Sequence, residues 1–119
     1  MKTRMLIVTL AVIISMPALF AQDQKTEKFI VAGNCGMCEK RIENAAKSLE
    51  GVSFADWNKE TKMLEVKFDS DKTNLDKIQE AIAEVGHDTK MHKASDEVYN
   101  DLPACCKYDR MKDEGKQDE

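Results

Sequence analysis

Residues 29–51 read "FIVAGNCGMCEKRIENAAKSLEG", and the spacing of the apolar residues changes within this stretch. Over residues 25–33 the side chains alternate between two faces, which is typical of a β-strand. The apolar residues then recur at the spacing of one helix face, at Cys38, Ile42, Ala45 or Ala46, and Leu49. Gly51 is placed to end that helix. The stretch therefore predicts a strand followed by a helix, with Cys35 and Cys38 where the two meet.

The residues that follow predict a hairpin and a second helix. Residues 52–58 and 63–68 return to an alternating pattern, and the polar residues between them suit a hairpin turn. Thr73 or Asn74 can cap a helix whose apolar residues again recur at helical spacing, at Leu75, Ile78, Ile82 and Val85. This helix ends at a glycine, and residues 87–93 are predicted to form a last short strand.

The order strand, helix, strand, strand, helix, strand is the βαββαβ pattern of the ferredoxin-like fold. We therefore predict an α+β domain over residues 26–93, with a four-stranded antiparallel sheet covered by two helices on one face. Residues 94–119 form a C-terminal extension of different character. A short helix can begin at Ser95 and end before Pro103. The charged residues after Cys106 lack an apolar period and are expected to be disordered.

Residues 1–21 have the layout of a secretory signal peptide. Lys2 and Arg4 precede an uncharged apolar run, and Ala21 offers a small residue at the predicted cleavage point. A membrane anchor is the alternative, because the uncharged run is close to the roughly 20 residues that a membrane span needs. We predict export, into the periplasm if the source is a Gram-negative bacterium, with no stable membrane insertion after cleavage.

The charge of the mature chain limits its partners. Removal of 21 of the 119 residues leaves 98, and the loss of two of the 18 basic side chains against 22 acidic ones changes the net charge from −4 to −6. Such a surface argues against nucleic acid, which needs a concentrated basic face. The chain has room for one domain, and we expect a monomer.

The CxxC pair supports three kinds of chemistry. It can hold a soft metal ion, exchange electrons as a dithiol, or close into a structural disulfide. The start of a helix favours the thiolate form, which is the form that binds metal or attacks disulfides. Two thiolates suit Cu(I) first, because it accepts low coordination. Hg(II), Zn(II) and Cd(II) also bind two thiolates, although structural zinc usually takes four ligands.

Three stretches carry a family resemblance: "FIVAGNCGMCEKRIENAAKSLEGV", "ADWNKETKMLEVKFD" and "LDKIQEAIAEVGHD". Together they resemble the heavy-metal-associated domain, the module of copper chaperones, of metal-binding repeats in copper-transporting ATPases and of periplasmic mercury-binding proteins. The resemblance implies metal binding at Cys35 and Cys38, and a donor or acceptor protein such as a transporter or chaperone. Gly33 and Asn34 depart from the family, in which Met and Thr commonly stand before the CxxC motif, and this leaves the metal open.

Four further residues are candidates for the site. Met37 is interpreted as a hydrophobic lid over the metal. The resemblance places His87 beside the CxxC loop, where it is a third metal ligand or a residue that supports the ligands without binding the metal. A solvated surface position is the alternative. Cys105 and Cys106 lie outside the domain, but the eleven residues 94–104 can span roughly 35 Å at about 3.3 Å per residue. This pair can add thiolate ligands, form a disulfide with the CxxC cysteines, or remain unused.

The leading hypothesis is an exported carrier that scavenges or hands on Cu(I) by thiolate exchange, and it is not an enzyme. A thiol oxidoreductase with Cys35 as nucleophile and Cys38 as resolving thiol is the second hypothesis. The order of elements argues against it, as does the position of Pro103, the one proline of the mature chain, outside the domain. A purely structural disulfide domain is the third.

Overall fold

The computed structural model describes residues 24–111, so the predicted signal peptide and residues 112–119 lie outside the described part. The elements follow in the order β1 (Gln24–Ile30), α1 (Gly36–Lys47), β2 (Val52–Trp57), β3 (Met63–Asp69), α2 (Leu75–Glu84), α3 (Asp96–Asn100) and the single 3₁₀ turn η1 (Ala104–Cys106). None of the helices in residues 24–111 has the length and apolar character needed to cross a membrane.

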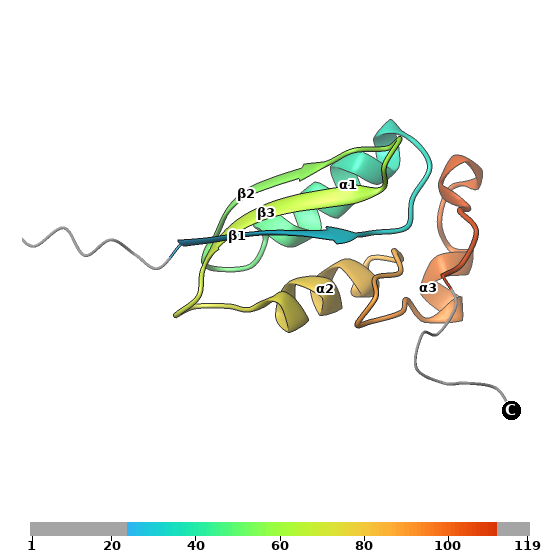
Figure 1. The fold of residues 1–119 in the computed structure, drawn as a ribbon. Coiled ribbons are helices and arrows are strands. Elements are labelled where there is room, and N and C mark those ends of the chain that lie inside the picture. The colour runs from blue at the N-terminus through green and yellow to red at the C-terminus, as the bar shows by residue number, and fades with distance from the viewer. Residues whose placement is uncertain (1–23, 112–119) are drawn as a thin grey trace, which may run out of the picture.

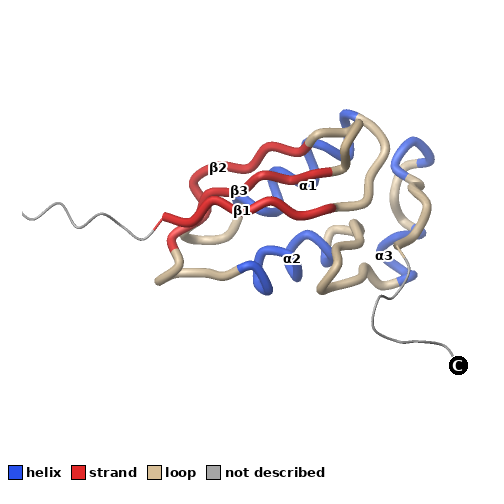
Figure 2. Tube along the Cα trace, in the orientation of Figure 1, coloured by secondary structure: helices blue, strands red, loops and turns tan. Residues whose placement is uncertain are grey.

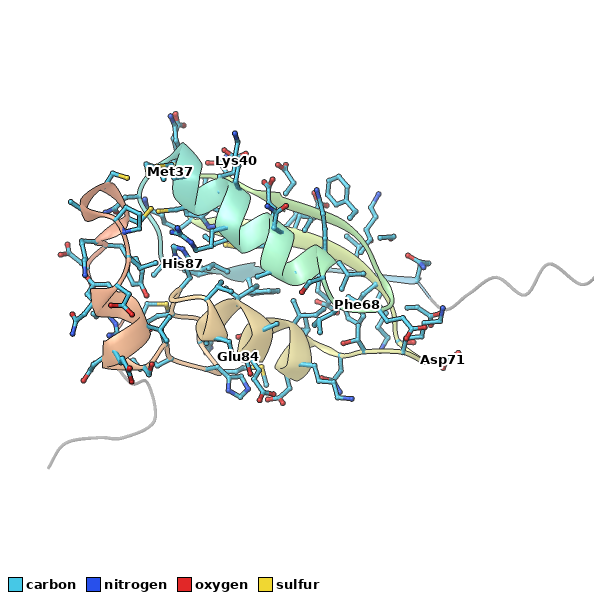
Figure 3. The ribbon with its side chains drawn as sticks, turned by 180° about the vertical axis from the view of Figure 1, so that it is seen from behind. Met37, Lys40, Phe68, Asp71, Glu84 and His87 are labelled. Carbon is cyan, nitrogen blue, oxygen red and sulfur yellow. The ribbon has the colours of Figure 1, made fainter. Side chains whose placement is uncertain are left out.

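The sheet is antiparallel, with β3 in the centre between β1 and β2 (Figure 2). Helices α1 and α2 lie side by side on one face of this sheet, in front of the strands in Figure 3. The residues buried between helices and sheet are mostly apolar and include Val31, Ile42, Trp57, Leu64, Val66, Ile78 and Ile82. The predicted α+β class, the hairpin and the two helices on one face are confirmed.

The predicted fourth strand is wrong for the described residues. Within residues 87–93, only Thr89 pairs as a strand residue would. It forms an isolated antiparallel bridge to Val31, the residue that follows β1. The backbone N–H and the hydroxyl of Thr89 both donate to the carbonyl of His92, and the N–H of His92 donates back to that hydroxyl. These bonds bend residues 89–92 into a turn, because a threonine side chain can bind backbone groups that a strand would otherwise use.

Helix α2 begins and ends where local signals place it. The side chain of Asn74 accepts a hydrogen bond from the backbone N–H of Lys77, which confirms one of the two predicted caps. Gly86 then ends the helix with φ +108°, and a Cβ atom there would lie 2.9 Å from Leu102 Cδ2. A glycine is therefore needed both for the backbone conformation and for the close approach of the chain that returns later.

That returning chain, residues 95–111, is named the C-terminal strap. It begins with α3, whose predicted cap is confirmed because Ser95 Oγ accepts from the N–H of Val98. Figure 1 shows the strap, in orange and red, beside the loop that joins β1 to α1. The expectation of disorder after Cys106 is wrong for residues 107–111, since Tyr108 is buried and Arg110 pairs with a buried carboxylate. The charged composition of this segment does not reveal that residues 107–111 are ordered, because the charge of Arg110 is paired with Asp88 within the fold.

Candidate metal centre

The CxxC pair lies at the N-terminus of α1. Cys35 is the N-cap residue with extended backbone, and Cys38 is the third residue of the helix. Their sulfur atoms are 3.7 Å apart, and both cysteines are free thiols. Cys38 is fully buried in the core, whereas Cys35 is partly exposed. One helical turn therefore turns both sulfurs to the same side, with one anchored and one reachable from solvent.

Trp57 packs against the loop that joins β1 to α1 and carries Cys35. Its indole Nε1–H donates to the carbonyl of Val31 at 3.0 Å, at the end of β1. A Cβ atom on Gly33 would lie 3.0 Å from the Trp57 ring and 3.2 Å from the Cβ of Cys38. The ring occupies the space that a side chain at position 33 would need. This explains physically how the loop remains packed although the methionine common in the family is missing.

The Cys35 sulfur is stabilised as a thiolate. The backbone N–H of Cys38 is the main cause, with smaller contributions from the N–H of Met37 and from neighbouring thiols, and together they lower the pKa of Cys35 to about 6. Partial burial opposes this shift without overcoming it. Donors at a helix N-terminus favour a thiolate for this reason. Cys35 therefore carries a negative charge at neutral pH.

The strap brings Cys106 to the CxxC pair. Its sulfur lies 3.7 Å from that of Cys35, and Arg41 Nη1 donates to it at 3.5 Å. Burial is the main cause that raises the pKa of Cys106 to about 12, and hydrogen bonds with the sulfurs of Cys38 and Cys35 act in the same direction. Without a bound ion, Cys106 is thus a neutral thiol that donates to the Cys35 thiolate.

Cys105 and Met37 lie at the rim of this sulfur group. Cys105 is exposed, and its sulfur is 3.9 Å from that of Cys106 and 3.6 Å from Met37 Sδ. The sulfurs of Cys35, Cys105 and Cys106 all lie within 4.8 Å of one another. Met37 is 53% exposed and lines a surface cavity together with Cys35 and Cys105. The side chains of both rim residues are therefore at the entrance.

His87 is buried rather than solvated. Its Nδ1–H donates to the carbonyl of Ala32 at 2.8 Å, and its ring stacks on Tyr108 with 5.4 Å between centroids. Burial is the main cause that lowers the pKa of His87, which favours the neutral ring. Its Nε2 is buried and has no hydrogen-bond partner among the described residues. The groups of three or more ligand atoms found in residues 24–111 do not include His87.

Three residues that the sequence reasoning missed hold the strap in place. The hydroxyl of Tyr108 donates to the carbonyl of Gly86 at 2.6 Å and accepts from the N–H of Asp88 at 2.9 Å. Arg110 donates to both carboxylate oxygens of Asp88, at 2.7 and 2.9 Å. Arg41, which donates to the Cys106 sulfur, is a fourth missed residue. The sequence does contain a signal for it, because Arg41 follows Cys38 by three residues and so lies on the same helix face. No comparable local pattern marks Tyr108, Asp88 or Arg110.

The low pKa predicts how Cys35 reacts. With a pKa of about 6, alkylation of Cys35 by iodoacetamide is expected to rise with pH through 6 and to level off near neutral pH. Peptide mapping by mass spectrometry separates it from the other cysteines, and Cys35→Ser is the control for the site assignment. Alkylation of Cys35 that is half-maximal near pH 9 would contradict the prediction.

Comparisons with known proteins show the family to which the chain belongs. The heavy-metal-associated domain profile matches residues 29–88. The copper chaperone CopZ of Staphylococcus saprophyticus is 38% identical over 66 residues, which cover 55% of this chain and 97% of that protein. A solved CopZ metallochaperone is 32% identical, with a TM-score of 0.53 over 55% of this chain and 98% of its own. The water-soluble region of the P-type ATPase CopA from Bacillus subtilis is 33% identical, with a TM-score of 0.54 over 58% of this chain and 46% of that one. The chain belongs to the heavy-metal-associated domain family.

Proposed function

We propose that this protein is an exported carrier that binds Cu(I) through Cys35 and Cys38 and passes it to a partner by thiolate exchange. The observation that carries the proposal is the pair of sulfurs 3.7 Å apart at the start of α1, one in a buried residue and one in a partly exposed residue whose pKa is lowered to about 6. Copper chaperones among the relatives support Cu(I) as the cargo. The leader pattern of residues 1–21 supports export.

The exchange uses the difference between the two cysteines. An incoming thiolate from the partner bonds to the ion, and the bond to Cys35 then breaks, because Cys35 lies at the partly exposed edge of the site. Cys38 is anchored in the core and leaves last. Copper stays Cu(I) throughout, and no covalent bond of a substrate changes, so the protein acts as a carrier rather than an enzyme.

A metal transporter is the partner that the comparisons support best. The soluble region of CopA, a P-type ATPase, has the same fold at 33% identity. Two domains of this kind can approach each other with their CxxC loops, since Cys35 and Met37 both lie at an accessible surface cavity. The surface of this protein is acidic overall, so electrostatic complementarity favours a partner with a basic face around its own thiols.

Copper binding by the reduced full-length chain tests the proposal. We expect one tightly bound Cu(I) per chain in competition with a Cu(I)-specific chelator, and loss of that binding in Cys35→Ser with Cys38→Ser. His92→Ala, away from the sulfur group, is the matched control. In protein purified from its source cells, the first residue is expected to be Gln22. Retention of copper by the double variant, or dithiol oxidation of a model substrate without metal at a comparable rate, would refute the function.

A further inference from the structure

We propose that Cys106 is a third ligand to the ion held by Cys35 and Cys38, supplied by the C-terminal strap. This inference rests on the proposed function, because it assigns an additional ligand to the same site. The family profile ends at residue 88, whereas the strap comprises residues 95–111. Cys106 therefore belongs to a part of the chain that the family resemblance does not describe.

The sulfur spacing fits three-coordinate binding. With a metal–sulfur bond of about 2.3 Å, two sulfurs that share an ion are about 4.6 Å apart in a linear pair and about 4.0 Å apart in a trigonal set. Cys35 is 3.7 Å from Cys38 and also 3.7 Å from Cys106. Both distances are close to the trigonal value and well below the linear one. Two of the three sulfur–sulfur distances of a trigonal set are therefore already in range, and a movement of the side chains that brings the sulfurs of Cys38 and Cys106 together completes the set.

The surroundings of Cys106 suit a thiolate once an ion is present. Arg41 Nη1 donates to its sulfur at 3.5 Å, and this guanidinium offsets part of the negative charge that three thiolates and one Cu(I) carry together. When the copper–sulfur bond forms, the proton of the Cys106 thiol passes to solvent, and no electron is transferred. The buried position then excludes water from the bond.

The strap holds this ligand in place by contacts that do not involve the metal. Tyr108 bonds Gly86 and Asp88, and Arg110 forms an ion pair with the fully buried Asp88 carboxylate. These residues follow Cys106 by two and four positions. The third thiolate is therefore positioned before the ion arrives, and such a tethered ligand strengthens binding through its high effective concentration.

This arrangement changes how the ion is released. A two-coordinate ion leaves its third position open to a partner's thiolate, whereas here Cys106 occupies that position. The partner must displace Cys106 before exchange can begin. The strap therefore makes the protein hold copper more tightly and transfer it more slowly than the domain without a third thiolate.

X-ray absorption of the Cu(I)-loaded full-length chain is the first test, because it needs no variant. Three sulfur neighbours are expected for the wild type and two for Cys106→Ser. Cys106→Ser is also expected to hold Cu(I) on the order of 100-fold more weakly in chelator competition. Cys105→Ser is the discriminating variant, because its sulfur also lies within 4.8 Å of those of Cys35 and Cys106. Three sulfur neighbours and wild-type affinity in this variant are expected, and they assign the third ligand to Cys106 rather than to Cys105.

The outcomes separate this inference from the proposed function. If Cys35→Ser with Cys38→Ser abolishes binding while the wild type shows two sulfur neighbours and Cys106→Ser has wild-type affinity, only the inference fails. An equal loss in Cys105→Ser, or bridged copper ions at more than one per chain, overturns the assignment to Cys106. A disulfide between Cys35 and Cys106 that persists under reductant also overturns it. Near-wild-type circular dichroism of Cys106→Ser verifies that the strap remains folded.

Discussion

Replacing Asp88 with alanine is expected to lower the free energy of unfolding by about 3 to 5 kcal/mol, the range for breaking a buried ion pair. The Asp88 carboxylate is fully buried and accepts from Arg110 and from the backbone N–H groups of Ala94 and Met111. Its removal leaves the guanidinium, which is only 26% exposed, without its main partner. Chemical denaturation of the reduced protein measures the change.

Asp96→Ala is the matched control for this prediction. Asp96 also contacts Arg110, at 3.1 Å, but its side chain is 94% exposed. Exposed pairs contribute little, so a loss of no more than about 1 kcal/mol is expected. Asp88→Ala is also expected to expose the Cys106 thiol to alkylation, because the strap loses its anchor. Equal stability losses in the two variants would contradict the role assigned to the buried carboxylate.

Trp57→Ala is expected to cost about 3 to 5 kcal/mol, as large-to-small substitutions of buried aromatic residues do. The Trp57 side chain is 2% exposed, and its indole both donates to Val31 and fills the space beside Gly33. The substitution leaves a cavity beside the loop that joins β1 to α1, and it removes the buried hydrogen bond between the indole and Val31. Thermal or chemical unfolding measures the loss.

Phe54→Ala provides the comparison on the same strand. Phe54 lies on β2 as well, but its side chain is 37% exposed. We expect a clearly smaller loss, of about 1 kcal/mol, because more than a third of the Phe54 surface remains in contact with solvent in the folded state and less apolar area is buried than at Trp57. If Trp57→Ala were no more destabilising than Phe54→Ala, the indole would not be the support of the loop.

The parts of the fold that could be predicted are those with local signals. The change from strand to helix spacing around Cys35 and Cys38, the cap at Asn74 and the glycine end of α2 each depend on residues within a few positions of one another. The last strand was predicted wrongly because its pattern was weak. There, bonds between Thr89 and His92 overrode the tendency of the segment to extend.

The sequence by itself determined the chemistry of this protein, a pair of thiols at a helix N-terminus in a heavy-metal-associated domain. That result depends on the four-residue motif from Cys35 to Cys38 and on the spacing of apolar residues in the segments around it. Only the tertiary structure decided that Cys106 joins the pair. Its position depends on Tyr108 meeting Gly86 and Arg110 meeting Asp88, in each case across 22 residues of chain. Such contacts form only when the folded core places both partners together, so no local pattern announces them.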